Sequence, residues 1–263
     1  MPGRKLKLLV AFLMLTGIFA LLSLATNNNR GISPQSLKVT IADTEGQLLV
    51  TEEQIETKIL NAYPQLLGSP LEQGDLRQVE EVVKGISFVN RAHAFRQPDG
   101  NIQVNTLLFT PLVRVVNALN QSFYITHEGR LVPLSPHFTP RVMVATGNIR
   151  AGYSPVVDLK AVTPPEEITP NERVLRDLFY LATTISNDAF LKSFFDHIHI
   201  TSTGQFELTP RNGAHIVELG GVDRLDSKFD KLIRFYRHSL LNTGWEYYSR
   251  INIEFNNQVI CSK

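Results

Sequence analysis

The stretch 37–63, LKVTIADTEGQLLVTEEQIETKILNAY, decides the fold of the first domain. Apolar and polar residues alternate over 37–41, which predicts a half-buried β-strand. Thr51 and Gln54 have the spacing of a helix capping box, in which each side chain hydrogen-bonds the backbone amide of the other residue. A short helix is therefore expected to follow and to end before Pro64. Its apolar residues recur four apart: Ile55, Ile59 and Tyr63.

A second helix and a β-hairpin complete this pattern. Asp75 is a candidate helix cap, and the apolar stripe that follows it ends at Gly85. The members of this stripe are Leu76, Val79, Val82 and Val83. The segments 88–95 and 102–104 are strand-like and flank the turn Pro98-Asp99-Gly100. Because neither helix is long enough to be stable alone, we expect both to lie on one face of a three-stranded sheet.

An uncharged apolar run precedes this domain. Residues 8–25, LLVAFLMLTGIFALLSLA, would cover about 27 Å as a helix, close to the hydrocarbon thickness of a bilayer. Arg4, Lys5 and Lys7 precede the run, which by the positive-inside rule places residues 1–7 in the cytoplasm. We expect a transmembrane helix at 8–25 and a linker at 26–36. The alternative is a cleaved signal peptide, for which Ser23-Leu24-Ala25 offers small residues.

The composition excludes several classes of protein. The 263 residues are 43% hydrophobic and 19% charged, which is typical of globular domains. Of 26 basic residues, three lie ahead of the apolar run, and the remaining 23 face 25 acidic residues, a balance that argues against a nucleic-acid binder. Cys261 is the only cysteine, so the chain can form neither an internal disulfide nor a multi-cysteine zinc site.

The remainder of the chain, residues 111–263, is expected to form a larger domain of mixed strands and helices. Short strands are predicted at 122–126 and 141–146, and a hairpin over 197–209. One helix has an apolar stripe made of Val174, Leu175, Leu178, Phe179, Ala182 and Ile185. A later helix, over 229–240, is expected to keep its basic residues on a solvated face: Lys228, Lys231, Arg234 and Arg237.

The chain ends in an alternating pattern that predicts a long strand from Tyr247 to Phe255. Because we expect it to be the last strand, it is a candidate for a sheet edge. The free N–H and C=O groups of an edge strand can pair with another chain.

Enzyme motifs are absent from the sequence. It contains no G-x-S-x-G, no H-E-x-x-H, no dinucleotide fingerprint and no phosphate loop. His197 and His199 share one face of a predicted strand and would hold a metal only with a third ligand, so a solvated face is the preferred interpretation. Gly220-Gly221 is interpreted as a tight turn, and Cys261 as a small apolar residue. We therefore predict a binding or scaffolding protein with no catalytic residues, no cofactor and no metal.

Four short motifs follow one another in the second half of the chain. They are Pro111-Leu-Val-Arg-Val115, Phe123-Tyr-Ile-Thr-His-Glu-Gly-Arg130, PRVMVATG at 140–147, and NIEFNNQVIC at 252–261. The module before them is similar to a POTRA domain. Together with the apolar run, this order resembles the bacterial FtsQ/DivIB cell-division family, in particular its Bacteroidetes branch. The chain departs from the family in the second motif, where the usual aspartate is missing.

The resemblance implies an α+β protein with a transmembrane helix at 8–25, a POTRA-like βααββ domain at 37–110 and an FtsQ-type β domain at 111–263. It implies a non-enzymatic scaffold in the inner membrane, with its N-terminus in the cytoplasm and its bulk in the periplasm. FtsB- and FtsL-like partners would bind the C-terminal domain, and other divisome components the POTRA-like domain. Neither nucleic acid nor a small-molecule substrate is implied.

In this family the partner FtsB adds a strand to the final sheet edge. The matching positions here are Phe255, Asn257 and Gln258, with Ile253 and Glu254 as neighbours. In such β-augmentation, main-chain hydrogen bonds supply attachment and alternate side chains choose the partner. Phe255 is equally consistent with an inward core side chain. Two other functions stay open, namely an exported POTRA protein of transport or outer-membrane assembly and a secreted hydrolase.

Overall fold

The computed structural model describes residues 12–18, 33–42, 49–71, 74–240 and 247–263. The chain divides into two compact units, with the boundary in the sequence between Leu108 and Phe109. The expected cytoplasmic tail (1–7) and most of the expected transmembrane helix (8–25) lie outside the described residues, although residues 12–18 are helical. Among the helices within the described ranges, none has the length and apolar character needed to cross a membrane.

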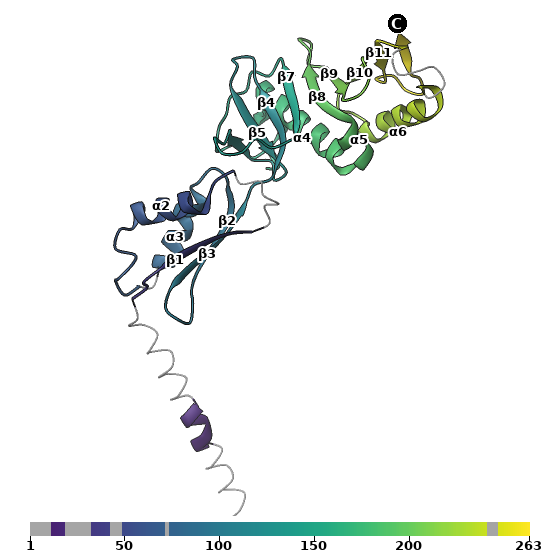
Figure 1. The fold of residues 1–263 in the computed structure, drawn as a ribbon. Coiled ribbons are helices and arrows are strands. Elements are labelled where there is room, and N and C mark those ends of the chain that lie inside the picture. The colour runs from purple at the N-terminus through teal and green to yellow at the C-terminus, as the bar shows by residue number, and fades with distance from the viewer. Residues whose placement is uncertain (1–11, 19–32, 43–48, 72–73, 241–246) are drawn as a thin grey trace, which may run out of the picture. The chain divides into compact units, whose positions relative to one another are not determined.

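The first unit is the predicted βααββ module. Its elements are β1 (Leu37–Ala42), α2 (Glu52–Ala62), α3 (Asp75–Lys84), β2 (Val89–Arg96) and β3 (Ile102–Leu108). The strand order is β1-β3-β2, with β1 parallel and β2 antiparallel to the central strand β3. Both helices lie on one side of the sheet, which confirms the predicted packing (Figure 1). Buried Ile55, Ile59, Val79 and Val83 contribute the helix side of the core.

The two helix starts differ from each other. The capping box of α2 is confirmed, because the Gln54 amide donates to Thr51 Oγ1 over 3.3 Å and the Thr51 amide donates to Gln54 Oε1 over 3.2 Å. At α3 the N-cap is Gly74 and not Asp75, which is the first helical residue. Gly74 has φ +122°, a conformation that only glycine adopts readily, and it makes no side-chain cap hydrogen bond.

The second unit contains one large mixed sheet. The strands are β4 (Pro111–Val116), β5 (Ser122–Thr126), β6 (Leu131–Pro133), β7 (Met143–Gly147), β8 (Phe195–Ile200), β9 (Phe206–Pro210), β10 (Ile216–Gly220), β11 (Arg250–Asn252) and β12 (Ile260–Ser262). Within the described residues their order is β12-β11-β10-β9-β8-β7-β4-β5-β6. The helices are α4 (Pro170–Asn187), α5 (Ala189–Phe194) and α6 (Leu225–Phe235), with short turns η1 (Pro165–Glu167) and η2 (Tyr236–Leu240).

The two faces of this sheet have opposite character. One face packs with the helices into a continuous apolar core that includes Leu178, Ile198, Leu208, Phe229 and Ile251. The alternate residues of β8 are polar, and Thr146 Oγ1 lies 3.0 Å from His197 Nε2 and 3.3 Å from His199 Nδ1. No group of three or more possible metal ligands occurs among the described residues. His197 and His199 therefore share a hydrogen-bonded surface with Thr146.

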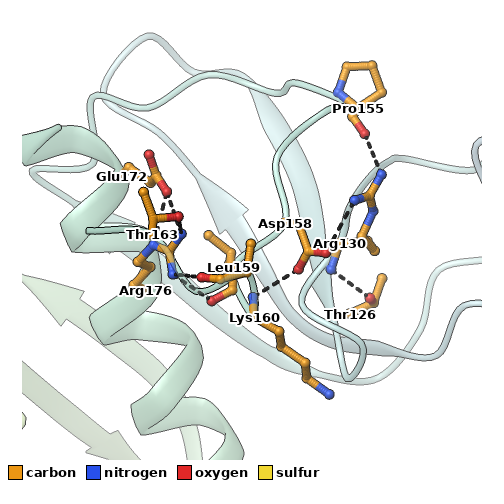
Figure 2. Close-up of polar contacts among 10 residues, drawn as sticks. Thr126, Arg130, Pro155, Asp158, Leu159, Lys160, Thr163, Glu172 and Arg176 are labelled. Carbon is orange, nitrogen blue, oxygen red and sulfur yellow. Dashed lines mark hydrogen bonds and ion pairs between the residues drawn. The ribbon is translucent and has the colours of Figure 1, made fainter. Parts of the chain in front are cut away.

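The long connection between β7 and α4 is fixed by two arginines (Figure 2). Arg176 of α4 donates to the carbonyl oxygens of Leu159 and Ala161 over 3.1 and 2.8 Å, and to Thr163 Oγ1 over 3.0 Å. Arg130 donates to the carbonyl oxygen of Pro155 over 3.1 Å. Arg130 ends the second sequence motif, so part of this motif serves to tie down a connection that lacks long regular elements.

Candidate functional site

The C-terminal strand differs from the sequence prediction. A single strand from Tyr247 to Phe255 was expected at the sheet edge, but β11 contains only Arg250–Asn252 and lies between β10 and β12. The prediction of one long edge strand is therefore wrong. The chain turns after β11 and returns as β12, which pairs antiparallel with β11 and occupies the edge.

Side-chain hydrogen bonds explain why β11 stops at Asn252. Asn252 Oδ1 accepts from the amide of Glu254 over 2.9 Å, and this local turn competes with continued strand pairing. The Asn252 amide group donates to Glu218 of β10 over 2.7 Å, which holds the last strand residue in place. Asn257 then adopts φ +57°, a left-handed conformation that asparagine tolerates better than most residues. The chain therefore reverses between 253 and 259.

This reversing segment, residues 253–259, is held by α6. Lys231 Nζ donates to the carbonyl oxygen of Ile253 over 2.9 Å and also to that of Phe255. Burial, followed by the charges of Lys228 and Arg224, lowers the pKa of Lys231. The prediction that the basic residues of this helix lie on a solvated face is therefore wrong for Lys231, and it is also wrong for Lys228.

The second exception on α6 is Lys228, whose side chain is only 3% exposed. Its Nζ donates to the carbonyl oxygen of Gly221 over 2.7 Å and to Asp223 Oδ1 over 3.1 Å. A buried ammonium group needs such partners to offset its lost hydration. Both lysines therefore attach α6 to the sheet end and do not form a free basic surface.

A charged cluster fixes the short strand β11 to its neighbours. Arg250 forms ion pairs with Glu218 of β10 and Glu207 of β9. Glu218 is opposite Glu207 in the β10–β9 register. The three side chains therefore form one row across the neighbouring strands β11, β10 and β9. Side-chain contacts thus supplement the few backbone hydrogen bonds that a three-residue strand can make.

The five residues predicted to bind a partner have different environments. Ile253 is fully buried in the core, so its side chain is not accessible to a partner. Phe255 is 46% exposed, which excludes the alternative of an inward core side chain. Glu254, Asn257 and Gln258 are exposed. All five lie in the reversing segment and not in a strand, and their role in partner binding stays a prediction.

The edge strand β12 is not among the elements that the sequence predicted. In β12, Ile260 is 45% exposed, whereas Cys261 packs partly against the core, as its interpretation as a small apolar residue predicted. Burial raises the pKa of the Cys261 thiol. The signal was present in the turn-forming run Asn256-Asn257-Gln258, which precedes the apolar pair Val259-Ile260. A turn at this run would have divided the terminal pattern into two strands.

Comparisons with known families agree with this architecture. Residues 110–262 match the family model described as FtsQ/DivIB, C-terminal related, and residues 34–106 match the model of the POTRA-like domain. A search of curated proteins found no match. The first match covers more than half of the chain, and the two matches follow the two compact units. The chain therefore belongs to the FtsQ/DivIB family, whose domains point to a role in bacterial cell division through contacts with other division proteins.

Proposed function

We propose that this protein is a non-enzymatic divisome scaffold whose strand β12 accepts a strand from an FtsB- or FtsL-like partner. One observation carries the proposal: β12 is the terminal strand of the sheet and pairs with β11 on only one side within the described chain. Its outer backbone groups are therefore available to a partner strand. A strand added there gains main-chain hydrogen bonds at a position where the sheet would otherwise end.

The side chains of β12 define what the partner strand should offer. Cys261 packs toward the core side of the sheet, so the partner residue beside it should be apolar. Ile260 is opposite Asn252, whose side chain donates a hydrogen bond to Glu218 on the polar face of the sheet. The partner residue beside Ile260 should therefore have both an apolar part and a polar group. The ring of Phe255, which is 46% exposed in the reversing segment that leads into β12, offers the partner an additional apolar contact.

The proposed location follows from the N-terminal sequence. The basic residues ahead of 8–25 support a single span in the inner membrane, with residues 1–7 in the cytoplasm and both folded units in the periplasm. In this arrangement the POTRA-like unit contacts other divisome components, and the second unit presents β12. The match over 110–262 favours this role over an outer-membrane assembly protein or a secreted hydrolase.

Site-specific photocrosslinking in the full-length protein tests the proposal. A photoreactive amino acid at Ile260 should capture the FtsB- or FtsL-like partner in cells, whereas the same group at the 82% exposed Val156 should not. A proline scan over Ile260–Ser262 gives the second measurement. Prolines at positions whose amides face outward should abolish capture and leave the circular dichroism spectrum unchanged. Full capture by every folded proline variant would refute strand addition at β12.

A further inference from the structure

A second candidate binding surface lies between the helices of the FtsQ-type unit. A cavity of about 540 Å³ opens between α4, α5 and α6. Its lining includes Tyr180 of α4, Leu191 of α5, and Asp226, Phe229, Asp230 and Ile233 of α6. This volume lies within the range of about 300–1,000 Å³ that is usual for ligand pockets in proteins. We refer to it below as the helix groove.

The part of α6 that faces the helix groove carries two parallel rows of side chains. Asp226 and Asp230 are four residues apart and form an acidic row, since such positions are neighbours on a helix surface. Phe229 and Ile233 form an apolar row beside it, with Phe229 buried and Ile233 half-buried. Within the described chain, neither aspartate forms an ion pair. The helix groove thus places unneutralised carboxylates next to an apolar floor.

The two lysines of α6 do not neutralise this acidic row, because both make other contacts, and the exposed Arg234 forms no ion pair with Asp230 among the described residues. Lys228 contacts Gly221 and Asp223, and Lys231 contacts the carbonyl oxygens of Ile253 and Phe255. Among the described residues, those that line the helix groove include no lysine or arginine. On the opposite wall, Tyr180 is 52% exposed, and an aromatic ring attracts a nearby cation.

We propose that the helix groove binds a cationic, amphipathic peptide segment of a partner protein. An arginine of this segment lies between Asp226 and Asp230 and beside the Tyr180 ring, and a neighbouring leucine-like side chain covers Phe229 and Ile233. Charge complementarity selects this occupant, because an acidic rim repels nucleic acid and anionic lipid. The proposal does not depend on strand addition at β12, and each can fail without the other.

Fluorescence anisotropy with designed peptides tests this proposal on the full-length protein. The probe is a labelled amphipathic dodecamer of leucine and arginine, and its twin carries glutamate in place of arginine. The arginine probe should bind and the glutamate twin should not. Asp226→Asn with Asp230→Asn should weaken binding of the arginine probe at least about tenfold, because two charge-assisted contacts are lost. Tyr180→Ala removes an exposed ring and should weaken the same binding several-fold.

The matched control is Glu166→Gln with Glu167→Gln. It removes the same formal charge from the exposed turn η1, which precedes the opposite end of α4. This control should change binding less than twofold. Equal weakening by both double variants would show nonspecific charge attraction and overturn the proposal. Unchanged binding by the Asp226/Asp230 variant would also overturn it. So would self-association of the native protein that this variant abolishes, because the occupant of the groove would then be a second copy of this chain.

Discussion

Lys231 of α6 donates to the carbonyl oxygen of Ile253 over 2.9 Å, directly after the point where strand β11 ends. The carbonyl oxygens of residues 253 and 255 no longer lie in a strand, and the ammonium group supplies a hydrogen-bond donor to both. One lysine on a helix thereby positions the segment that leads into the edge strand. Lys231 thus links α6 to the segment before β12, a structural role that the sequence pattern of a basic helix did not indicate.

Replacing Lys231 with methionine should destabilise the reversing segment. The substitution keeps the length of the side chain and removes the donor, which should cost about 2 kcal/mol of unfolding free energy for a charged hydrogen-bonding group. Hydrogen exchange of the amides in residues 253–262 should become faster than in the native protein. The control is Arg234→Met, which removes an exposed charge from the same helix. Similar exchange in both variants would contradict the positioning role.

The first unit could be predicted almost completely from sequence, because its signals are local. The capping box, the turn at residues 98–100 and the alternating strands each specify their own element. In the second unit, the ends of elements depend on contacts between distant residues. The stop after Asn252 involves Glu218, and the burial of Lys228 involves Gly221 and Asp223. Periodicity alone contains no information on these pairs, so the long edge strand and the solvated basic face were predicted wrongly.

Gly147 should be intolerant of any side chain. It ends β7 with φ +103°, and a Cβ built there would lie 2.1 Å from the carbonyl oxygen of Ile200 in the adjacent strand β8. Gly147→Ala should therefore destabilise the second unit by at least about 3 kcal/mol, measured by urea denaturation. Gly204 separates the effect of backbone strain from that of the steric clash, because it has φ +80° but no atom within 4 Å of a Cβ built there. Gly204→Ala should cost only the conformational strain of about 1–2 kcal/mol. Equal losses in both variants would show that strain, and not the clash with Ile200, sets the cost.

Arg176 should act through the shape of its guanidinium group and not only through its charge. It contacts three acceptors of the β7–α4 connection and is ion-paired with Glu172 over 2.7 Å (Figure 2). Arg176→Lys keeps the charge but cannot reach these acceptors together. Limited proteolysis should then cut residues 151–163 at least several times faster. The exposed Arg173 provides the control, and Arg173→Lys should leave the cleavage rate unchanged. No acceleration in Arg176→Lys would mean that other contacts hold the connection.

His197 should make the second unit less stable in mild acid. Burial, and secondarily the charge of His199, lowers the pKa of His197 in the folded protein. The unfolded chain keeps an ordinary histidine pKa of about 6.5 and therefore binds the proton first as the pH falls. The free energy of unfolding should accordingly decrease as the pH drops through about 6.5 and level off below the folded-state pKa.

His197→Gln keeps a hydrogen-bonding group near Thr146 and should reduce this decrease, measured by urea denaturation at pH 7.5 and 5.5. The exposed His137 is the control, and His137→Gln should leave the decrease intact. A wild-type decrease in the His197→Gln variant would assign the pH dependence to other groups, among which His127 also has a pKa lowered by burial.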